Sequence, residues 1–357
     1  MIVGIPKEIK TCEYRVALVP SDVKALIDAG CEVIVQSKAG NGAGFNDKSY
    51  KEVGAKIVSS IEDVYNEAEI IVKVKEPLPP EYELFKENQI LFSYLHLTEG
   101  IPEVKKPLAN MLLKSKVISF SYELIKTNSG ERPFLAPMSK IAGHLAVLLA
   151  AQYLQKHQGG KGILFGCIEG FKPPTIVILG AGNVGQAAAK VALSLGADVI
   201  ILDINPEKLK YLERIFKGKA KTLLSTPENI KNAVKKADVL INAIFYSPSE
   251  EEERKYLIPK ELVAQMERGS VIIDVSADEP GPIETIKLTT LGNPAYEWQG
   301  IIHVATPNLP STVPRTSSCI FSKRVLPLVM EVATKGWRKA IKENAFLACG
   351  ITTALGE

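Results

Sequence analysis

Four charged or titratable side chains follow apolar runs of the chain and have the chemistry of a small-molecule site. Arg15 follows the first apolar run, and its planar guanidinium suits a carboxylate. Lys75 and His96 each follow a later apolar run, at the end of a strand where open α/β sheets bind ligands. Asp278 lies just beyond the apolar run 271–275. Together these groups could hold a small acid and move protons near neutral pH.

Each of these residues also has a plainer interpretation. Arg15 would equally form a surface ion pair, and Lys73 has the same claim as Lys75 by composition alone. A histidine on an apolar segment is more often a buried structural residue than a catalyst. Asp274 competes with Asp278, whose position in the loop after the strand slightly favours it. Two further histidines are interpreted as structural: His144 and His303.

A glycine turn separates the β-branched run 175–179 from an Ala-rich stretch with helical periodicity at 186–195. Its first glycine permits a tight turn, its second lets the backbone approach a pyrophosphate, and its third lets the helix pack close to the strand. The amide groups at the helix start would face the phosphates. We therefore assign four residues of this turn to a dinucleotide site: Gly180, Gly182, Val184 and Gly185.

An acidic residue, Asp203, ends the next apolar run, 197–202, about 20 residues beyond the glycines. A carboxylate there accepts hydrogen bonds from the ribose hydroxyls and would repel a 2′-phosphate, which favours NAD over NADP. A glycine turn alone would leave open a loop that binds nothing. The strand, the helix and the distal acid in this order favour a nucleotide site.

The elements that must position these residues alternate between strand and helix patterns, which indicates an α/β fold. Strands are expected before the glycine turn at 2–5, 32–36, 55–58, 70–74, 89–92 and 117–119, and after it at 239–244, 271–275 and 301–305. Helices are expected at 20–29, 47–55, 137–157 and 321–333. For the first helix, Ser21 is the expected N-cap.

A chain of 357 residues is long for a single core. We predict two Rossmann-like domains with parallel sheets, joined by long helices. The NAD-binding domain, 133–310, would be inserted into a substrate domain formed by 1–132 and 311–357.

The composition narrows the class of protein. A net charge of +3 gives no reason to expect nucleic acid as a partner, and 46% hydrophobic with 23% charged residues is typical of globular proteins. No apolar run reaches the roughly 18 residues of a membrane span. The five cysteines lack CxxC spacing, so neither a disulfide framework nor a metal site is indicated. The N-terminus reads as an immediate strand without a signal peptide, and we expect a cytoplasmic protein.

Several ordered motifs resemble the alanine dehydrogenase and pyridine nucleotide transhydrogenase family over nearly the whole length. They are Val3-Gly-Ile-Pro-Lys-Glu, Glu13-Tyr-Arg-Val-Ala-Leu-Val-Pro, Lys73-Val-Lys-Glu-Pro, Leu91-Phe-Ser-Tyr-Leu-His-Leu, Leu135-Ala-Pro-Met-Ser and Leu202-Asp-Ile-Asn-Pro. Ordered motifs along the chain are far more specific than a glycine turn.

The resemblance implies a role for each candidate residue. Arg15 and Lys75 would bind the carboxylate and the carbonyl oxygen of the substrate. His96 would be the acid/base and Asp278 the second catalytic group. The NAD site would be lined by Ser139, Asp203 and Asn308, although capping of a helix is a competing role for Ser139. The assembly would be a homohexamer.

Three segments depart from the family pattern, and all are expected near the nicotinamide and the substrate. Asp278-Glu-Pro-Gly replaces Asp-Gln-Gly-Gly, Ala305-Thr-Pro-Asn-Leu-Pro replaces Cys-Val-Ala-Asn-Met-Pro, and 245–255 lacks Pro-Gly-Ala-Lys. Asp274-Val-Ser-Ala-Asp and Asn308-Leu-Pro-Ser are similar to the saccharopine dehydrogenase branch.

We therefore predict an NAD-dependent amino-acid dehydrogenase that converts L-alanine reversibly to pyruvate and ammonia. The alternatives are a saccharopine-type enzyme acting on a larger amino acid and, from another class, a transhydrogenase-like NAD-binding subunit. A two-domain cleft would have to hold Cα roughly 3–3.5 Å from the nicotinamide.

Overall fold

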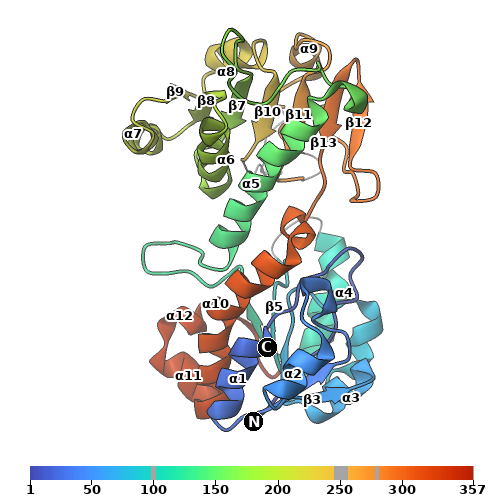
Figure 1. Cartoon of the computed structure of the whole chain (residues 1–357). Coiled ribbons are helices and arrows are strands. Elements are labelled where there is room, and N and C mark those ends of the chain that lie inside the picture. The colour runs from blue at the N-terminus through green and yellow to red at the C-terminus, as the bar shows by residue number, and fades with distance from the viewer. Residues whose placement is uncertain (98–101, 245–255, 278–280, 357) are drawn as a thin grey trace. The chain divides into compact units, whose positions relative to one another are not determined.

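The computed structural model describes residues 1–97, 102–244, 256–277 and 281–356. The chain divides into two compact units, one formed by Met1–Met138 with Pro310–Glu357 and the other by Ser139–Leu309. We call them the discontinuous unit and the continuous unit. Each contains a seven-stranded, mostly parallel sheet with helices packed against it, which confirms the predicted α/β class with two Rossmann-like sheets (Figure 1).

The sheet of the discontinuous unit has the order β14-β6-β5-β4-β1-β2-β3. Only β14 is antiparallel to its neighbour. The strands are β1 (Ile2–Ile5), β2 (Glu32–Gln36), β3 (Lys56–Val58), β4 (Ile70–Val72), β5 (Ile90–Ser93), β6 (Ile118–Ser121) and β14 (Ile351–Thr353). The helices are α1 (Pro20–Asp28), α2 (Asp47–Glu52), α3 (Ile61–Glu67), α4 (Pro102–Lys114), α10 (Pro314–Lys335), α11 (Trp337–Glu343) and α12 (Ala345–Ala348), with 3-10 turns at Asn41–Ala43 (η1) and Pro79–Leu84 (η2).

The C-terminal segment completes this first sheet. β14 pairs with β6, and two serines of α10 accept hydrogen bonds from backbone amides near the start of the chain, Ser318 from Val16 and Ser322 from Val19. Phe321 of α10 also packs on the rings of Tyr94 and Tyr122. The first 138 residues therefore need the last 48 to form their core.

The continuous unit has the sheet order β12-β13-β11-β10-β7-β8-β9, in which only the β12–β13 pair is antiparallel. Its strands are β7 (Thr175–Leu179), β8 (Asp198–Asp203), β9 (Ala220–Leu224), β10 (Val239–Asn242), β11 (Val271–Asp274), β12 (Ala295–Trp298) and β13 (Ile301–Val304). Its helices are α6 (Asn183–Ser194), α7 (Pro206–Ile215), α8 (Pro227–Val234) and α9 (Lys260–Val263), with a 3-10 turn at Lys156–Gln158 (η3). At the boundary between the units lie α5 (Leu135–Tyr153) and the 3-10 turn Leu309–Thr312 (η4).

One expected detail is wrong, and several elements lie outside the expected ranges. Ser21 is not an N-cap, because α1 begins at Pro20 and its N-cap is Val19, which makes no side-chain capping bond. Proline is favoured at a first helical position because its φ is already helical. Strands β9 and β12 were not expected, because their apolar residues are interrupted by polar ones and only partly buried.

Among the described residues, none of the helices has the length and apolarity that a membrane span requires.

Candidate functional site

Two of the predicted residues meet at the carboxyl-end edge of the first sheet. Lys75 follows β4 and His96 follows β5, and these two strands are parallel neighbours. The Nζ of Lys75 lies 3.4 Å from the Nε2 of His96. Parallel strands place the residues that follow them at one edge of the sheet, where α/β folds bind ligands.

Lys75 has a lowered pKa. The pKa of Lys75 is lowered to about 8, first by burial and then by the positive charges of Arg15 and Lys10. The amine therefore loses its proton in the pH range in which enzymes work, and it lies within the field of Arg15. Lys75 is thus linked to two other predicted residues of this unit, to His96 by contact and to Arg15 by its charge.

The competing lysine has a different environment. Lys73 is fully buried, with its Nζ 3.2 Å from Glu8 and 2.8 Å from Glu81. Two carboxylates compensate the charge of a buried amine, and together they raise its pKa. Lys73 thus belongs to an interior ion cluster, whereas Lys75 is half-buried.

Arg15 does not form the surface ion pair that was the alternative. It is 3% exposed, and both carboxylate oxygens of Glu13 accept hydrogen bonds from its guanidinium, at 2.7 Å for Nε and 2.5 Å for Nη2. Its Nη1 lies 3.5 Å from the Sδ of Met138. The bidentate pair fixes the plane and the direction of the guanidinium.

The backbone at His96 is left-handed, with a φ of 51°. The imidazole stacks on the ring of Tyr94 with centroids 5.7 Å apart, and it is only half-buried. Its own amide donates a 2.6 Å hydrogen bond to the carboxylate of Glu123. Sequence reasoning missed Glu123 and Glu8, although both are acids that follow apolar strands, because only the sheet order shows which neighbours they reach.

In the continuous unit, the glycine turn has the geometry that a dinucleotide needs. Gly180 has a φ of 101°, which favours glycine, and Gly182 is the N-cap of α6. A Cβ on Gly182 would have no atom within 4 Å, so the space beside it is open. A Cβ on Gly185 would lie 1.9 Å from the carbonyl oxygen of Gly180, so the close packing of α6 on β7 requires glycine at this position. The turn therefore fits a pyrophosphate at the start of α6.

The acid at the end of β8 is tied to this turn. One oxygen of Asp203 accepts a 2.6 Å hydrogen bond from the amide of Ala181, and the other accepts one of 2.8 Å from Asn205. The carboxylate is 8% exposed. These bonds hold it beside the glycine turn, the position in which a ribose would be recognised.

The other residues predicted for the nucleotide differ in position. Val184 lies in the first turn of α6, and Asn308 precedes η4 with a left-handed φ of 62°. Ser139 lies beyond the first turn of α5, which begins at Leu135, so the alternative of N-capping is wrong. Asp278 lies outside the described residues.

The remaining polar candidates differ in burial and in their hydrogen-bond partners in the described part of the chain. Asp274 is buried and accepts hydrogen bonds from Asn242 and from the amide of Ala277, and burial raises its pKa. His303 is buried between Thr285 and the carbonyl of Ile301, and burial lowers its pKa to about 4. It therefore stays neutral near pH 7. His144 is exposed, and its Nδ1 contacts the carbonyl of Lys140 one helical turn earlier.

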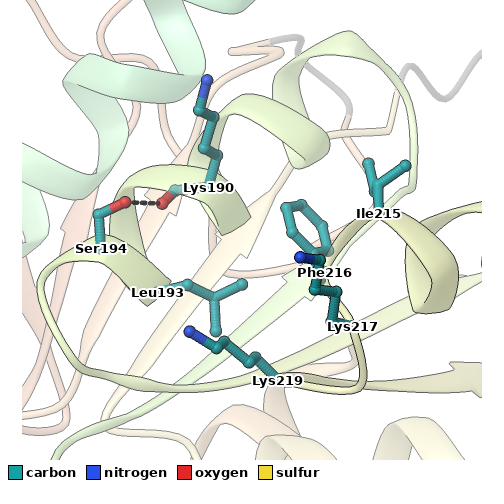
Figure 2. Close-up of a pocket in the computed structure, with 7 residues that line it drawn as sticks. All are labelled: Lys190, Leu193, Ser194, Ile215, Phe216, Lys217 and Lys219. Carbon is teal, nitrogen blue, oxygen red and sulfur yellow. Dashed lines mark hydrogen bonds between the residues drawn. The ribbon is translucent and has the colours of Figure 1, made fainter.

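Two surface pockets of the continuous unit lie at the amino ends of its strands, opposite the end that carries the glycine turn. Figure 2 shows the smaller, of about 230 Å³, which is lined by the last residues of α6 and the segment 215–219. The larger, of about 690 Å³, includes the first residues of β7 and β8, Thr175 and Asp198. The glycine turn follows the carboxyl end of β7, so neither pocket belongs to the dinucleotide site.

Comparisons with known proteins agree over both units. The model "Alanine dehydrogenase/PNT, N-terminal domain" matches residues 4–142, and "Alanine dehydrogenase/PNT, C-terminal domain" matches 146–357. An alanine dehydrogenase of Methanococcus maripaludis is 44% identical over 358 residues, which cover 100% of this chain and 94% of that protein.

Two solved structures have the same fold. An L-alanine dehydrogenase is 41% identical, with a TM-score of 0.93 over 100% of this chain and 96% of that one. A transhydrogenase from Sinorhizobium meliloti has a TM-score of 0.82 at 21% identity, over 100% of this chain and 98% of that one. At that lower identity the likeness concerns the fold alone.

Proposed function

We propose that this chain, which belongs to the alanine dehydrogenase/PNT family, catalyses the NAD-dependent oxidative deamination of L-alanine to pyruvate and ammonia, and the reverse reaction. The observation that supports this most directly is the 3.4 Å approach of Lys75 to His96 in the field of Arg15. A site for a nucleotide alone has no use for a carboxylate clamp beside an acid/base.

The discontinuous unit would bind the amino acid. Arg15, held in one plane by Glu13, would pair with the substrate carboxylate. Lys75 would donate a hydrogen bond to the oxygen that becomes the ketone of pyruvate. Its lowered pKa lets it exchange a proton near pH 8, as a group beside a changing oxygen must.

His96 would move the protons of the reaction. After Cα loses hydride the substrate is an imine, and water must add to it before ammonia leaves. The imidazole would take a proton from that water and return one to the departing amine, the acid/base role for which histidine is suited. Its neighbour Lys75 lies close enough to stabilise the oxygen that the water contributes. Asp278, outside the described residues, would be the second catalytic group.

The continuous unit would hold NAD, which accepts the hydride from Cα when bound. The turn from Gly180 to Gly185, with Val184, would receive the pyrophosphate, and Asp203 the ribose hydroxyls. Ser139 and Asn308 would contact the remainder of the dinucleotide. We propose a nucleotide domain of 133–310 and a substrate domain of 1–132 with 311–357, and the division of the chain into two compact units supports this proposal. We further propose a cytoplasmic homohexamer, which size-exclusion chromatography with light scattering would test.

A panel of amino acids assayed with NAD by the absorbance of the reduced cofactor tests the reaction. L-Alanine should give the highest kcat/KM, with pyruvate as the product. Turnover with lysine plus 2-oxoglutarate and none with alanine would instead indicate a saccharopine-type enzyme. Hydride exchange between two nucleotides, without any amino-acid activity, would indicate the transhydrogenase class.

The acid/base role makes a prediction of its own. His96→Ala should lower kcat for alanine by at least about 100-fold, the effect of losing a general acid/base, and should leave NADH affinity within about twofold. Fluorescence titration with NADH measures the second quantity. Equal losses of turnover and NADH affinity would show that His96 is structural. His144→Ala, an exposed histidine of the other unit, is the matched control and should change neither.

A further inference from the structure

Two buried glutamates occupy equivalent positions on either side of the Lys75–His96 pair. The sheet order β6-β5-β4-β1 places the two strands that lead to His96 and Lys75, β5 and β4, between two flanking strands. Glu123 comes two residues after β6, and Glu8 comes three residues after β1. Each flanking strand therefore delivers one carboxylate to the same edge of the sheet as the pair.

Glu123 binds the backbone that leads to His96. The carboxylate is 2% exposed and accepts hydrogen bonds from the amides of Leu95, at 3.2 Å, and His96, at 2.6 Å. The strand ladder has ended at this point, and buried amides need an acceptor. A residue other than glycine persists at a φ of 51° only when its surroundings enforce it, and the bond from the His96 amide to this carboxylate is one contact at that position.

Glu8 repeats the arrangement on the other side. Its Oε1 accepts hydrogen bonds from the amides of Val74, at 2.6 Å, and Lys75, at 3.3 Å. Its Oε2 lies 3.2 Å from the Nζ of the buried Lys73. The same carboxylate thus fixes the backbone before the Lys75 side chain and compensates an interior charge.

We infer that Glu8 and Glu123 are positioning residues, each fixing the backbone of one residue that acts on the substrate: Glu8 fixes Lys75 and Glu123 fixes His96. The inference rests on the proposed roles of Lys75 and His96. The two clamps set the separation of the amine and the imidazole, which both act on one oxygen of the substrate. A displacement of about 1 Å in such a pair can cost on the order of 100-fold in rate.

A third buried glutamate is a matched control. Glu81 is 1% exposed, its Oε1 lies 2.8 Å from the Nζ of Lys73, and its Oε2 accepts a 2.9 Å hydrogen bond from the amide of Leu78. It is as buried as Glu123, shares the ion partner Lys73 with Glu8, and binds a backbone amide of its own. Its backbone partner is the amide of Leu78, three residues after Lys75, rather than the amide of Lys75 or His96 itself.

Glu123→Gln and Glu81→Gln in the full chain test the inference. Glu123→Gln should lower kcat for alanine by about 10- to 100-fold, with KM for alanine and the stoichiometry of NADH binding within about twofold of the wild type. Glu81→Gln should leave kcat within about twofold, even where its melting temperature falls. A loss of folded protein would instead lower kcat and NADH stoichiometry together.

The inference is overturned by a kcat of Glu123→Gln within twofold of the wild type, or by equal kcat losses in both variants. Should Glu123→Gln not fold, Glu123→Asp keeps the charge and withdraws it by one methylene, and the same kcat-selective loss is expected. Glu8→Gln makes the equivalent test for Lys75. A wild-type protein without activity on alanine contradicts the proposed function instead, so the two failures are distinguishable.

Discussion

At the scale of single residues, a site that must change its protonation state costs the fold stability. The pKa of Lys75 is about 8 in the folded chain against 10.5 for the free side chain, because the amine is buried near Arg15 and Lys10, with only partial compensation from Glu76 and Glu13. Between these two pH values the unfolded chain binds more protons than the folded one, so this group makes stability rise with pH. Below pH 8 the buried charge is a net cost.

Lys75→Met should therefore raise the free energy of unfolding at pH 7, by about 2 kcal/mol, while it abolishes turnover. The gain should shrink at pH 9.5, where the wild-type amine is already mostly neutral. Urea denaturation at the two pH values measures both. Lys24→Met, which removes an exposed lysine from an ion pair with Asp28, should show no such gain. A gain of equal size at both pH values would come from packing and would contradict the electrostatic origin.

The sequence predicts which residues belong to the site, but it does not predict which side chains surround them. Arg15, Lys75 and His96 follow apolar runs, and this pattern alone indicates residues at the edge of a sheet. What distinguishes Lys73 from Lys75 is its pair of buried carboxylates, Glu81 from η2 and Glu8 from the chain after β1. Glu8 is distant from Lys73 in sequence and becomes its neighbour through the order of the strands, which local periodicity does not encode.

At the scale of elements, the strand, turn and helix of the nucleotide site contain some residues that packing requires and others that nucleotide binding would require. The run 175–179 is predictable because every residue of β7 is buried and four of its five are apolar. Strands β9 and β12 are not, because partial burial leaves polar residues in both. Of Gly182 and Gly185, only Gly185 is confined by the packing of α6, as its position in the turn predicts.

Gly182→Ala and Gly185→Ala should therefore fail in different ways. The first adds a Cβ to open space, so the melting temperature should stay within about 2 °C while NADH affinity falls by tenfold or more, because the methyl group meets the pyrophosphate. The second places a Cβ 1.9 Å from a backbone oxygen, and both stability and affinity should fall. Thermal melts and NADH fluorescence titration separate the two. Unchanged affinity in Gly182→Ala would contradict binding of the pyrophosphate at this turn.

At the scale of the whole molecule, continuity of the chain decides which unit can stand alone. In the described part of the chain, two hydrophobic core clusters of the continuous unit consist of residues within Ser139–Leu309 and cover both faces of β7. The discontinuous unit is different, because α10 and β14 return from the far end of the chain to cover and extend its sheet. Burial of apolar side chains stabilises both units, but only the continuous unit is formed by a single segment of the chain.

A fragment of residues 139–309 should consequently fold and bind NADH on its own, whereas residues 1–138 should not fold. The first keeps its whole sheet and the turn at the start of α6, while the second lacks Phe321 and leaves Tyr94 and Tyr122 partly exposed. Circular dichroism with thermal melting measures folding, and NADH fluorescence measures binding. Joining residues 1–138 to residues 310–357 through a flexible linker should restore a cooperative melt. Failure of that joined chain to fold, while 139–309 folds, would mean that the discontinuous unit depends on more than its own sheet and helices.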